Sequence, residues 1–386
     1  MTASRLADRH RLAPEAHAQS LSLGAVGIAL LHIERAASGA ASWRLADDWL
    51  AASAVDPICV GHQATLLFGA PALAFALHGA AGPGRYAYAL RALDAQVAVL
   101  TRRRLADAHA RIDRGERPRL AEFDLFKGLT GLGTHLLRRD PGGDLLQEVL
   151  AYLVRLTEPL GPLPGWWTDE AATGGRASGA PGGHGNLSMA HGISGPLALL
   201  SLAARRGVTV PGQIEAIERI CAWMDGQRQD GDGGAWWPEI ITRADIDTGR
   251  AFRTRPLRPS WCYGTVGHAR AQQLAGLATA DHGRRRVAEQ AFIGCLNDPA
   301  WLDRLTESGL CHGWAGFLQA GWRIAADADD PVLPTRLRAL TGRLVPPPPG
   351  DPSIGFLSGA AGVALALLTA SGRQPVSGWD DCLLLN

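Results

Sequence analysis

Two cysteines and a histidine stand at matching positions before two glycines. In SWCYGTVG, Cys262 lies two residues before Gly264; in GLCHGWAG, Cys311 and His312 lie directly before Gly313. Zn²⁺ in proteins is four-coordinate and accepts sulfur and nitrogen ligands. Three protein ligands would leave one position open, the pattern of a catalytic rather than a structural site. The alternative for each cysteine taken singly is a small buried apolar side chain.

The chain has 6 cysteines. Those outside the matching positions are predicted to be core residues: Cys59, Cys221, Cys295 and Cys382. Cysteines spread so widely in a reducing compartment do not indicate a disulfide framework.

His191 and Asp124 are the candidates for proton transfer. His191 lies directly before Gly192 in SMAHGISG, and Asp124 lies four residues before Gly128 in DLFKGLTG. Histidine titrates near neutral pH and so suits acid–base work, and Asp124 could hold its ring or supply a charge. The alternatives are a satisfied core histidine or a fourth metal ligand for His191, and a helix N-cap for Asp124.

Arg258 and Tyr263 flank Cys262 in the sequence. Either could act at the site. An ion pair for Arg258 and a packed aromatic ring for Tyr263 are the structural alternatives.

The glycines belong to an internal repeat of G-x-x-G followed by an Ala/Leu-rich helical run. Its first glycines are Gly24, Gly69, Gly128, Gly192, Gly264, Gly313 and Gly359, and the copy at Gly69 is degenerate because Ala72 replaces the second glycine. Each step between copies holds about two helices, since an average helix is roughly 11–12 residues long. Repeats of this length indicate stacked helical hairpins.

The helices that follow the glycines are apolar on all sides, which predicts that they lie inside, while the charged intervening helices lie outside. An all-α, seven-fold α/α toroid follows, and an open helical solenoid is the alternative. We expect a single toroid domain over residues 1–386, with a small insertion around residues 79–122. Long loops rich in Pro and Gly are predicted at Gly161–Asn186, Asp225–Pro259 and Val345–Pro352.

Composition excludes several classes of function. The 386 residues carry a formal net charge of +1, so there is no basic field for nucleic acid. The N-terminus lacks the apolar core of a signal peptide, and the most apolar stretch, Gly355–Ala370, is short for a membrane span. We expect a cytoplasmic protein that associates with a membrane only through partners.

SMAHGISG, SWCYGTVG and GLCHGWAG together resemble the signature blocks of LanC-type lanthionine synthetases, and the resemblance spans nearly the whole chain. It implies a seven-fold α/α toroid that binds one Zn²⁺ through Cys262, Cys311 and His312. It also implies an acid–base role for His191, with Asp124, Arg258 and Tyr263 in support. Leu23, where the family often has a polar residue, and the degenerate second copy are departures that concern local geometry.

The resemblance implies a lanthipeptide cyclase acting on a dehydrated precursor peptide. A zinc-bound cysteine thiolate of the peptide would add to dehydroalanine or dehydrobutyrine and form a lanthionine or methyllanthionine ring. A dehydratase and an export transporter are the partners it implies. Tryptophans in the two long loops could cradle the peptide or pack against the scaffold: Trp166, Trp167, Trp236 and Trp237.

Three other functions are compatible with the motifs. The first is a thiol transferase that adds glutathione to activated alkenes. The second is a non-catalytic scaffold that binds precursor peptide, although such a scaffold has no need of an open metal position. The third is a prenyltransferase-like α/α barrel, which would be expected to use other zinc ligands and a partner subunit.

Overall fold

The computed structural model describes residues 17–82, 84–172, 175, 177, 179–231, 233–249, 254–345 and 353–386. The chain divides into two compact units. Unit 1 comprises residues 1–100 and 305–383, and unit 2 comprises residues 101–304 and 384–386. The repeat copies at Gly313, Gly359, Gly24 and Gly69 fall in unit 1, and the other three fall in unit 2.

A helix begins within two residues of each of the seven predicted glycines. The glycine-led helices are α1 (Ala25–Ala37), α3 (Ala70–Ala80), α6 (Leu129–Arg139), α8 (Ser194–Arg205), α11 (Thr265–Ala278), α14 (Trp314–Asp327) and α16 (Ala360–Ala370). Most of their residues are buried, as an apolar surface on all sides requires.

Between them run helices with one buried face. These are α2 (Arg44–Ser53), α4 (Ala87–Asp113), α5 (Leu120–Phe123), α7 (Asp144–Leu156), α9 (Gln213–Gln227), α10 (Arg243–Thr248), α12 (His282–Asn297), α13 (Pro299–Leu302) and α15 (Leu333–Ala339), with 3₁₀ turns at Thr341–Arg343 and Trp379–Leu383. In unit 2, α12 buries only four of its 16 residues, whereas α11, which it contacts, buries 12 of 14. The predicted division into inner and outer helices is confirmed for this pair.

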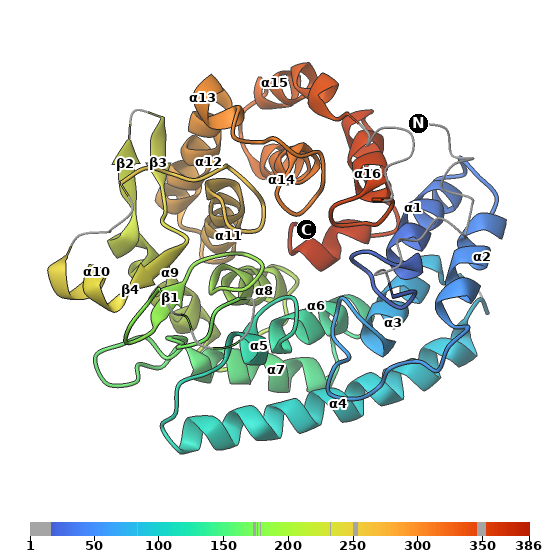
Figure 1. Cartoon of the computed structure of the whole chain (residues 1–386), viewed down its shortest axis with the longest axis horizontal. Helices are drawn as coiled ribbons and strands as arrows, with labels where there is room; N and C mark the ends of the chain where they lie inside the picture. Colours follow the sequence, from blue (N-terminus) through green and yellow to red (C-terminus); the bar gives the residue numbers. More distant parts are fainter. Residues whose placement is uncertain are drawn as a thin grey trace. The chain divides into compact units, whose positions relative to one another are not determined.

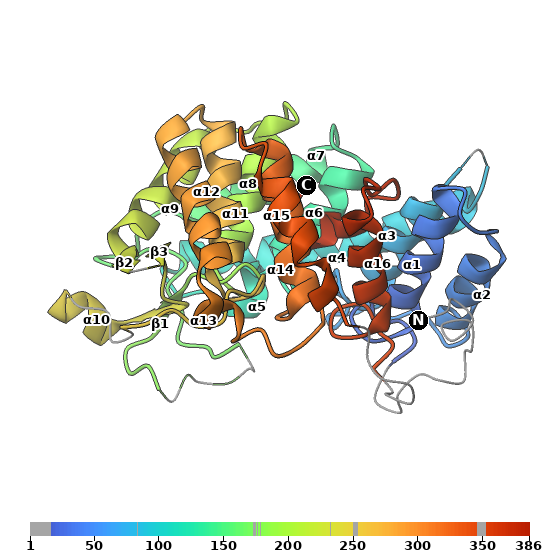
Figure 2. The same cartoon turned by 90° about the horizontal axis from the view of Figure 1, so that it is seen from above.

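The glycine-led helices contact one another in order within each unit. In unit 2, α6 contacts α8 and α8 contacts α11; in unit 1, α14 contacts α16, α16 contacts α1 and α1 contacts α3 (Figure 1). The α16–α1 contact, which is also clear in Figure 2, sets the seventh copy beside the first. An open solenoid keeps its end repeats apart, so the predicted α/α toroid is confirmed against that alternative.

The segment 79–122, for which an insertion was predicted, consists mainly of the 27-residue helix α4 followed by α5. The prediction of a single domain with an insertion stays a prediction.

Two of the predicted loops contain short strands that the sequence patterns did not reveal. β1 (His184–Asn186) pairs antiparallel with β4 (Ile240–Thr242), and β2 (Gln229–Gly231) pairs antiparallel with β3 (Gly234–Trp236). Three-residue strands are too short to show alternation, which explains the omission. Apart from Val345, the third predicted loop lies outside the described residues.

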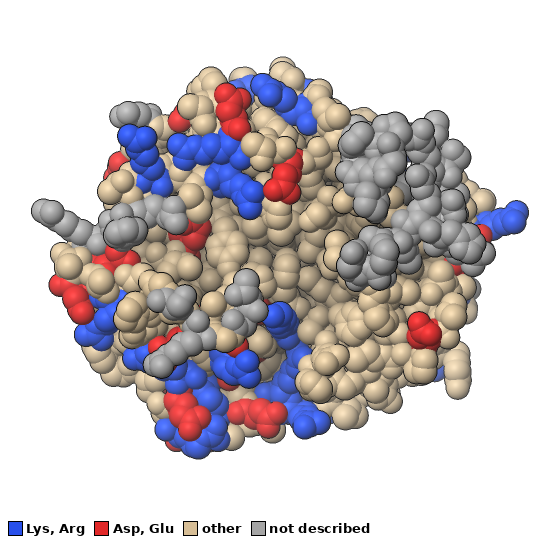
Figure 3. All heavy atoms as spheres, viewed as in Figure 1, with Lys and Arg blue, Asp and Glu red and all other residues tan. Residues whose placement is uncertain are grey.

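No helix among the described residues combines the length and the hydrophobicity that crossing a membrane requires. On the face shown in Figure 3, basic and acidic side chains are intermixed. This mixture agrees with the formal net charge of +1.

Candidate active site

The loops that precede the glycine-led helices share one backbone geometry. We call each of them a mouth loop, defined as the residues from six positions before the first glycine up to that glycine, such as 186–192 before α8, 258–264 before α11 and 307–313 before α14. In five copies the glycine N–H donates to the carbonyl four residues earlier, at 2.9–3.1 Å; the donors are Gly24, Gly128, Gly192, Gly264 and Gly313. The mouth loop therefore folds as a turn onto the helix.

Both glycines of G-x-x-G are required by this turn. A Cβ at Gly313 would lie 2.3 Å from the carbonyl oxygen of Glu307, and a Cβ at Gly316 would lie 1.8 Å from that of Leu310. The φ of Gly313 is −116°, which any residue adopts, so space rather than backbone conformation selects glycine here. The two glycines of the motif are thus needed because each helix lies close to its own mouth loop.

The degenerate second copy departs from this geometry. Gly69 has φ +73° and donates its N–H to the carbonyl of Gln19 instead. The carbonyl of Cys59 accepts from the first helical residue, Ala70, at 2.9 Å. Cys59 is therefore a partly buried backbone partner of α3, and its assignment to the core was wrong; the core assignment of Cys221, Cys295 and Cys382 is confirmed.

Neighbouring mouth loops are joined by backbone hydrogen bonds. In unit 2, Leu125 N donates to Ala190 O at 3.2 Å and Met189 N donates to Cys262 O at 2.9 Å. The same relation holds in unit 1, where Leu21 N donates to Leu67 O at 2.8 Å and Phe356 N to Ser22 O at 2.9 Å. These bonds align the side chains directly before each glycine with those of the next copy.

His191 and Asp124 meet at the mouth loops of α8 and α6. His191 Nδ1 lies 2.7 Å from Asp124 Oδ2, and since a carboxylate can only accept, Nδ1 carries the hydrogen. The Asp124 side chain is 1% exposed and that of His191 is 15% exposed. The ring of Phe126 packs edge-on against His191 with 4.7 Å between centroids. The imidazole is thus held on two sides, and its remaining nitrogen is Nε2.

Asp124 is not the N-cap of α6, a position that Gly128 occupies, but its side chain holds the turn before that helix. Its Oδ1 accepts from the backbone N–H groups of Lys127 at 2.6 Å and Gly128 at 2.9 Å. One carboxylate oxygen therefore holds the turn before α6 while the other orients His191. Asp124 therefore supports both the turn and the imidazole.

Tyr263 and Cys262 lie beside this pair. The Tyr263 ring is 6.1 Å from that of His191, and Asn186 Nδ2 donates to its hydroxyl at 3.4 Å. Burial raises the pKa of Tyr263, which keeps the phenol protonated and able to donate. Cys262 is 5% exposed and lies 3.7 Å from Ser260 Oγ. Arg258 supplies a backbone carbonyl to the turn before α11, and the role of its side chain stays a prediction.

The other two predicted ligands belong to unit 1. Cys311 Sγ and a ring nitrogen of His312 lie within 4.8 Å of each other, and both residues are partly exposed. Cys311 N donates to Leu357 O at 2.9 Å, which ties this mouth loop to that of α16. His312 Nε2 lies 2.8 Å from Glu307 Oε2. The sequence reasoning did not single out Glu307, although it stands six residues before Gly313, as Arg258 stands six before Gly264.

The donor set fits a zinc ion. Thiolates and an imidazole are zinc ligands, and Cys262 and Cys311 both precede a helix N-terminus, where the macrodipole favours a thiolate. The grouping of all three ligands stays a prediction, because Cys262 belongs to unit 2 and the Cys311–His312 pair to unit 1.

The four loop tryptophans are mainly structural. Trp166, Trp167, Trp236 and Trp237 are each no more than 4% exposed. Trp167 Nε1 donates to Gly182 O at 2.9 Å and Trp237 Nε1 to Met224 O at 3.1 Å. Burial of all four side chains supports the packing alternative, and their predicted use as an exposed peptide cradle is wrong. Trp166 differs from the other three because it lines a cavity.

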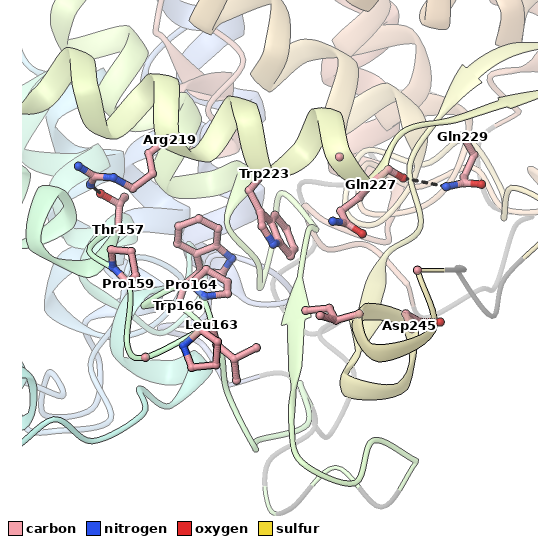
Figure 4. Close-up of a pocket in the computed structure, with 15 residues that line it drawn as sticks. Thr157, Pro159, Leu163, Pro164, Trp166, Arg219, Trp223, Gln227, Gln229 and Asp245 are labelled. Carbon is pink, nitrogen blue, oxygen red and sulfur yellow. Dashed lines mark hydrogen bonds between the residues drawn. The ribbon is translucent and has the colours of Figure 1, made fainter.

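That cavity lies within unit 2 and has a volume of about 630 Å³ (Figure 4). Trp166 and Trp223 pack edge to face along its wall, with 5.3 Å between centroids. Its charged groups are already engaged: Arg219 bonds the Thr157 hydroxyl, and Asp245 caps α10. None of the predicted site residues lines it, so this cavity does not carry the predicted chemistry.

Comparison with known proteins agrees with the fold. A family model described as "Lanthionine synthetase C-like protein" matches residues 15–384. "Nisin biosynthesis protein NisC" of Lactococcus lactis subsp. lactis is 21% identical over 203 residues, and this match covers 51% of the chain but only about half (48%) of that protein. A solved structure titled "Nisin cyclase" superposes with a TM-score of 0.81 at 19% identity, covering 97% of this chain and 94% of that one.

Proposed function

We propose that this chain, which belongs to the lanthionine synthetase C-like family, is a zinc-dependent lanthipeptide cyclase. The observation that carries the proposal is the His191–Asp124 pair, hydrogen-bonded at 2.7 Å in mouth loops that are joined by backbone bonds to that of Cys262. A positioned acid beside a thiol ligand is what thiol addition to an alkene requires. The substrate is a precursor peptide whose Ser and Thr residues have been dehydrated.

Cys262, Cys311 and His312 would hold the zinc ion. When bound, zinc at this site supplies a thiolate at neutral pH, because a coordinating thiol loses its proton. Two cysteine thiolates leave the centre electron-rich, which keeps an added thiolate nucleophilic.

His191 completes the reaction. As the sulfur–carbon bond forms at the β-carbon, the alkene electron pair moves to an enolate, whose α-carbon must receive a proton. Asp124 holds Nδ1–H, so Nε2 is the atom that would take up the proton released by the thiol and return it to the α-carbon. The Tyr263 hydroxyl and the Arg258 guanidinium are placed by the proposal at the enolate oxygen, where positioned donors stabilise developing charge.

A dehydratase would precede this enzyme, because it makes the alkene that the enzyme consumes. An export transporter would follow it. Both partners belong to the proposal, and it includes no nucleic acid.

The test compares His191→Ala with His282→Ala, an exposed histidine of unit 2 that lies outside the mouth loops. Both variants are incubated with dehydrated precursor, and uncyclised thiols are counted by alkylation and mass spectrometry. We expect His191→Ala to slow ring formation by about 10²- to 10⁴-fold, the range for a general acid, and the control to match the wild type.

Equal rates in both variants would remove His191 from the mechanism. Wild-type protein that binds the precursor without consuming thiols would favour a scaffold. Addition of glutathione to the alkenes, seen as an increase in mass, would favour a thiol transferase.

A further inference from the structure

The mouth loop of α14 contains an ionisable partner for a histidine that the proposed function uses as a metal ligand. His312 Nε2 and Glu307 Oε2 are 2.8 Å apart. A carboxylate only accepts hydrogen bonds, so Nε2 carries the hydrogen. Nε2 is then the protonated nitrogen and Nδ1 is the one that offers a lone pair.

We infer that Glu307 is a positioning residue that fixes the His312 tautomer and makes Nδ1 the zinc-binding atom. This inference rests on the proposed function. The two ring nitrogens point in different directions in the ring plane, so a carboxylate bound at Nε2 stands away from a metal at Nδ1. Carboxylates that hold the second nitrogen of a ligand histidine orient the ring and raise its basicity.

The backbone holds Glu307 in place. Its carbonyl accepts from Trp314 N, the first amide of α14, at 2.9 Å, and the next carbonyl, of Ser308, accepts from Ala315 N at 3.0 Å. Glycine at 313 permits this approach, since a Cβ there would lie 2.3 Å from the Glu307 oxygen. The mouth loop that carries His312 therefore also fixes the backbone of Glu307 at the start of α14.

The same position in neighbouring mouth loops carries other residues. Six residues before the glycine stand Asn186 in the loop of α8 and Arg258 in that of α11. Asn186 also accepts a backbone bond of this kind, from Ile193 N at 2.8 Å. The loops of α8 and α14 thus share this backbone bond. Of the three residues at this position, Glu307 is the one whose carboxylate faces a histidine.

Exposure sets the expected size of the effect. The Glu307 side chain is 49% exposed and that of His312 is 27% exposed, so water competes for this hydrogen bond. Loss of such a partner lowers metal affinity by about 10- to 100-fold, and we expect the lower end, about tenfold, for Glu307→Ala.

The experiment measures zinc affinity by competition with a chromophoric chelator for wild type, Glu307→Ala, Glu307→Gln and His312→Ala. Glu307→Gln keeps an acceptor oxygen and should recover most of the affinity. Glu116→Ala, which removes an exposed carboxylate paired with Arg114, is the matched control and should bind as the wild type does. Thermal unfolding of the zinc-free proteins checks that each variant folds.

A second readout leaves Glu307 unchanged. In full-length protein with ¹⁵N-labelled histidine and ¹¹³Cd in place of zinc, scalar coupling should appear at Nδ1 of His312, assigned from the His312→Ala spectrum. Coupling at Nε2, or unchanged zinc affinity in Glu307→Ala, would overturn the inference and leave the proposed function intact. Wild-type protein that binds no zinc would overturn both.

Discussion

The mouth loops of α8 and α14 place a histidine at the same position and hold it in opposite ways. His191 is bonded through Nδ1 to Asp124, which comes from another repeat copy and is 1% exposed. His312 is bonded through Nε2 to Glu307, five residues earlier in its own loop and 49% exposed. One ring therefore presents Nε2 and the other Nδ1, although the supporting backbone is alike.

Under the proposed function, this difference matches the two roles given to the histidines, proton transfer for His191 and metal binding for His312. A proton donor needs a ring fixed by a buried partner, because the direction of transfer depends on it. A metal ligand is oriented by the metal as well, so a weaker, hydrated partner suffices. The repeat supplies the backbone, and the side chains around each histidine determine its use.

The largest effect is expected from Asp124→Asn, which changes the buried partner of His191. The amide keeps an oxygen for the Lys127 and Gly128 N–H groups, but it presents N–H instead of an acceptor to His191 Nδ1. We expect ring formation to fall about 100- to 1,000-fold with little loss of stability, because the wrong tautomer is favoured.

The control is Asp281→Asn, since Asp281 accepts from Arg284 N at 2.9 Å at the start of α12. It should cyclise at the wild-type rate. Asp124→Asn with a normal rate would show that the buried carboxylate serves only the turn before α6.

The shared backbone can be tested with Gly316→Ala. A Cβ there would meet the Leu310 carbonyl oxygen at 1.8 Å, and a backbone atom cannot move aside cheaply. We expect a loss of about 3 kcal/mol in the free energy of unfolding, the upper end for overpacking, measured by urea denaturation. Gly342→Ala, where a Cβ would have open space, should change it by less than about 0.5 kcal/mol. Similar values for both would mean that the turn does not select glycine.

The smallest of the expected effects is at His268. It lies four residues after Gly264, where α6 has the apolar Leu132 after Gly128. Burial lowers the pKa of His268 to about 3, against 6.5 for an ordinary histidine. Below pH 6.5 the unfolded chain therefore binds a proton at His268, whereas the folded chain leaves the ring neutral. The free energy of unfolding consequently decreases as the pH falls.

The loss from His268 should be about 2 kcal/mol between pH 6.5 and 4.5. His268→Leu should remove that part of the acid sensitivity, seen as a flatter dependence of urea midpoints on pH. An unaltered slope would show that the folded protein accommodates a charged ring at this position.

The sequence predicted the parts of the molecule that depend on local repetition. Each first glycine marked a helix start, and in five copies this glycine closes the same turn before the helix. Asp124 and His191 were found for the same reason, since their distances from the glycines bring them to adjacent mouth loops.

Features that depend on packing were missed or misjudged. Trp167 and Trp237 lie in loops rich in Pro and Gly, yet their burial reflects partners such as Gly182 and Met224 that no spacing reveals. Glu307 was overlooked because a single glutamate before an apolar run is usually a solvated surface residue. Glu307 stands six residues before Gly313, the position that Arg258 has before Gly264. This shared position in the repeat is the signal that could have identified it.

The backbone hydrogen bonds that join neighbouring mouth loops do not depend on which side chains the loops carry. Met189 N and Cys262 O, for example, would make the same bond with other side chains at these positions. Substitutions directly before the glycines can therefore change the side chains that the mouth loops present while these backbone bonds stay in place. Within this architecture, a new chemistry requires exchange of a few side chains and no redesign of the helices.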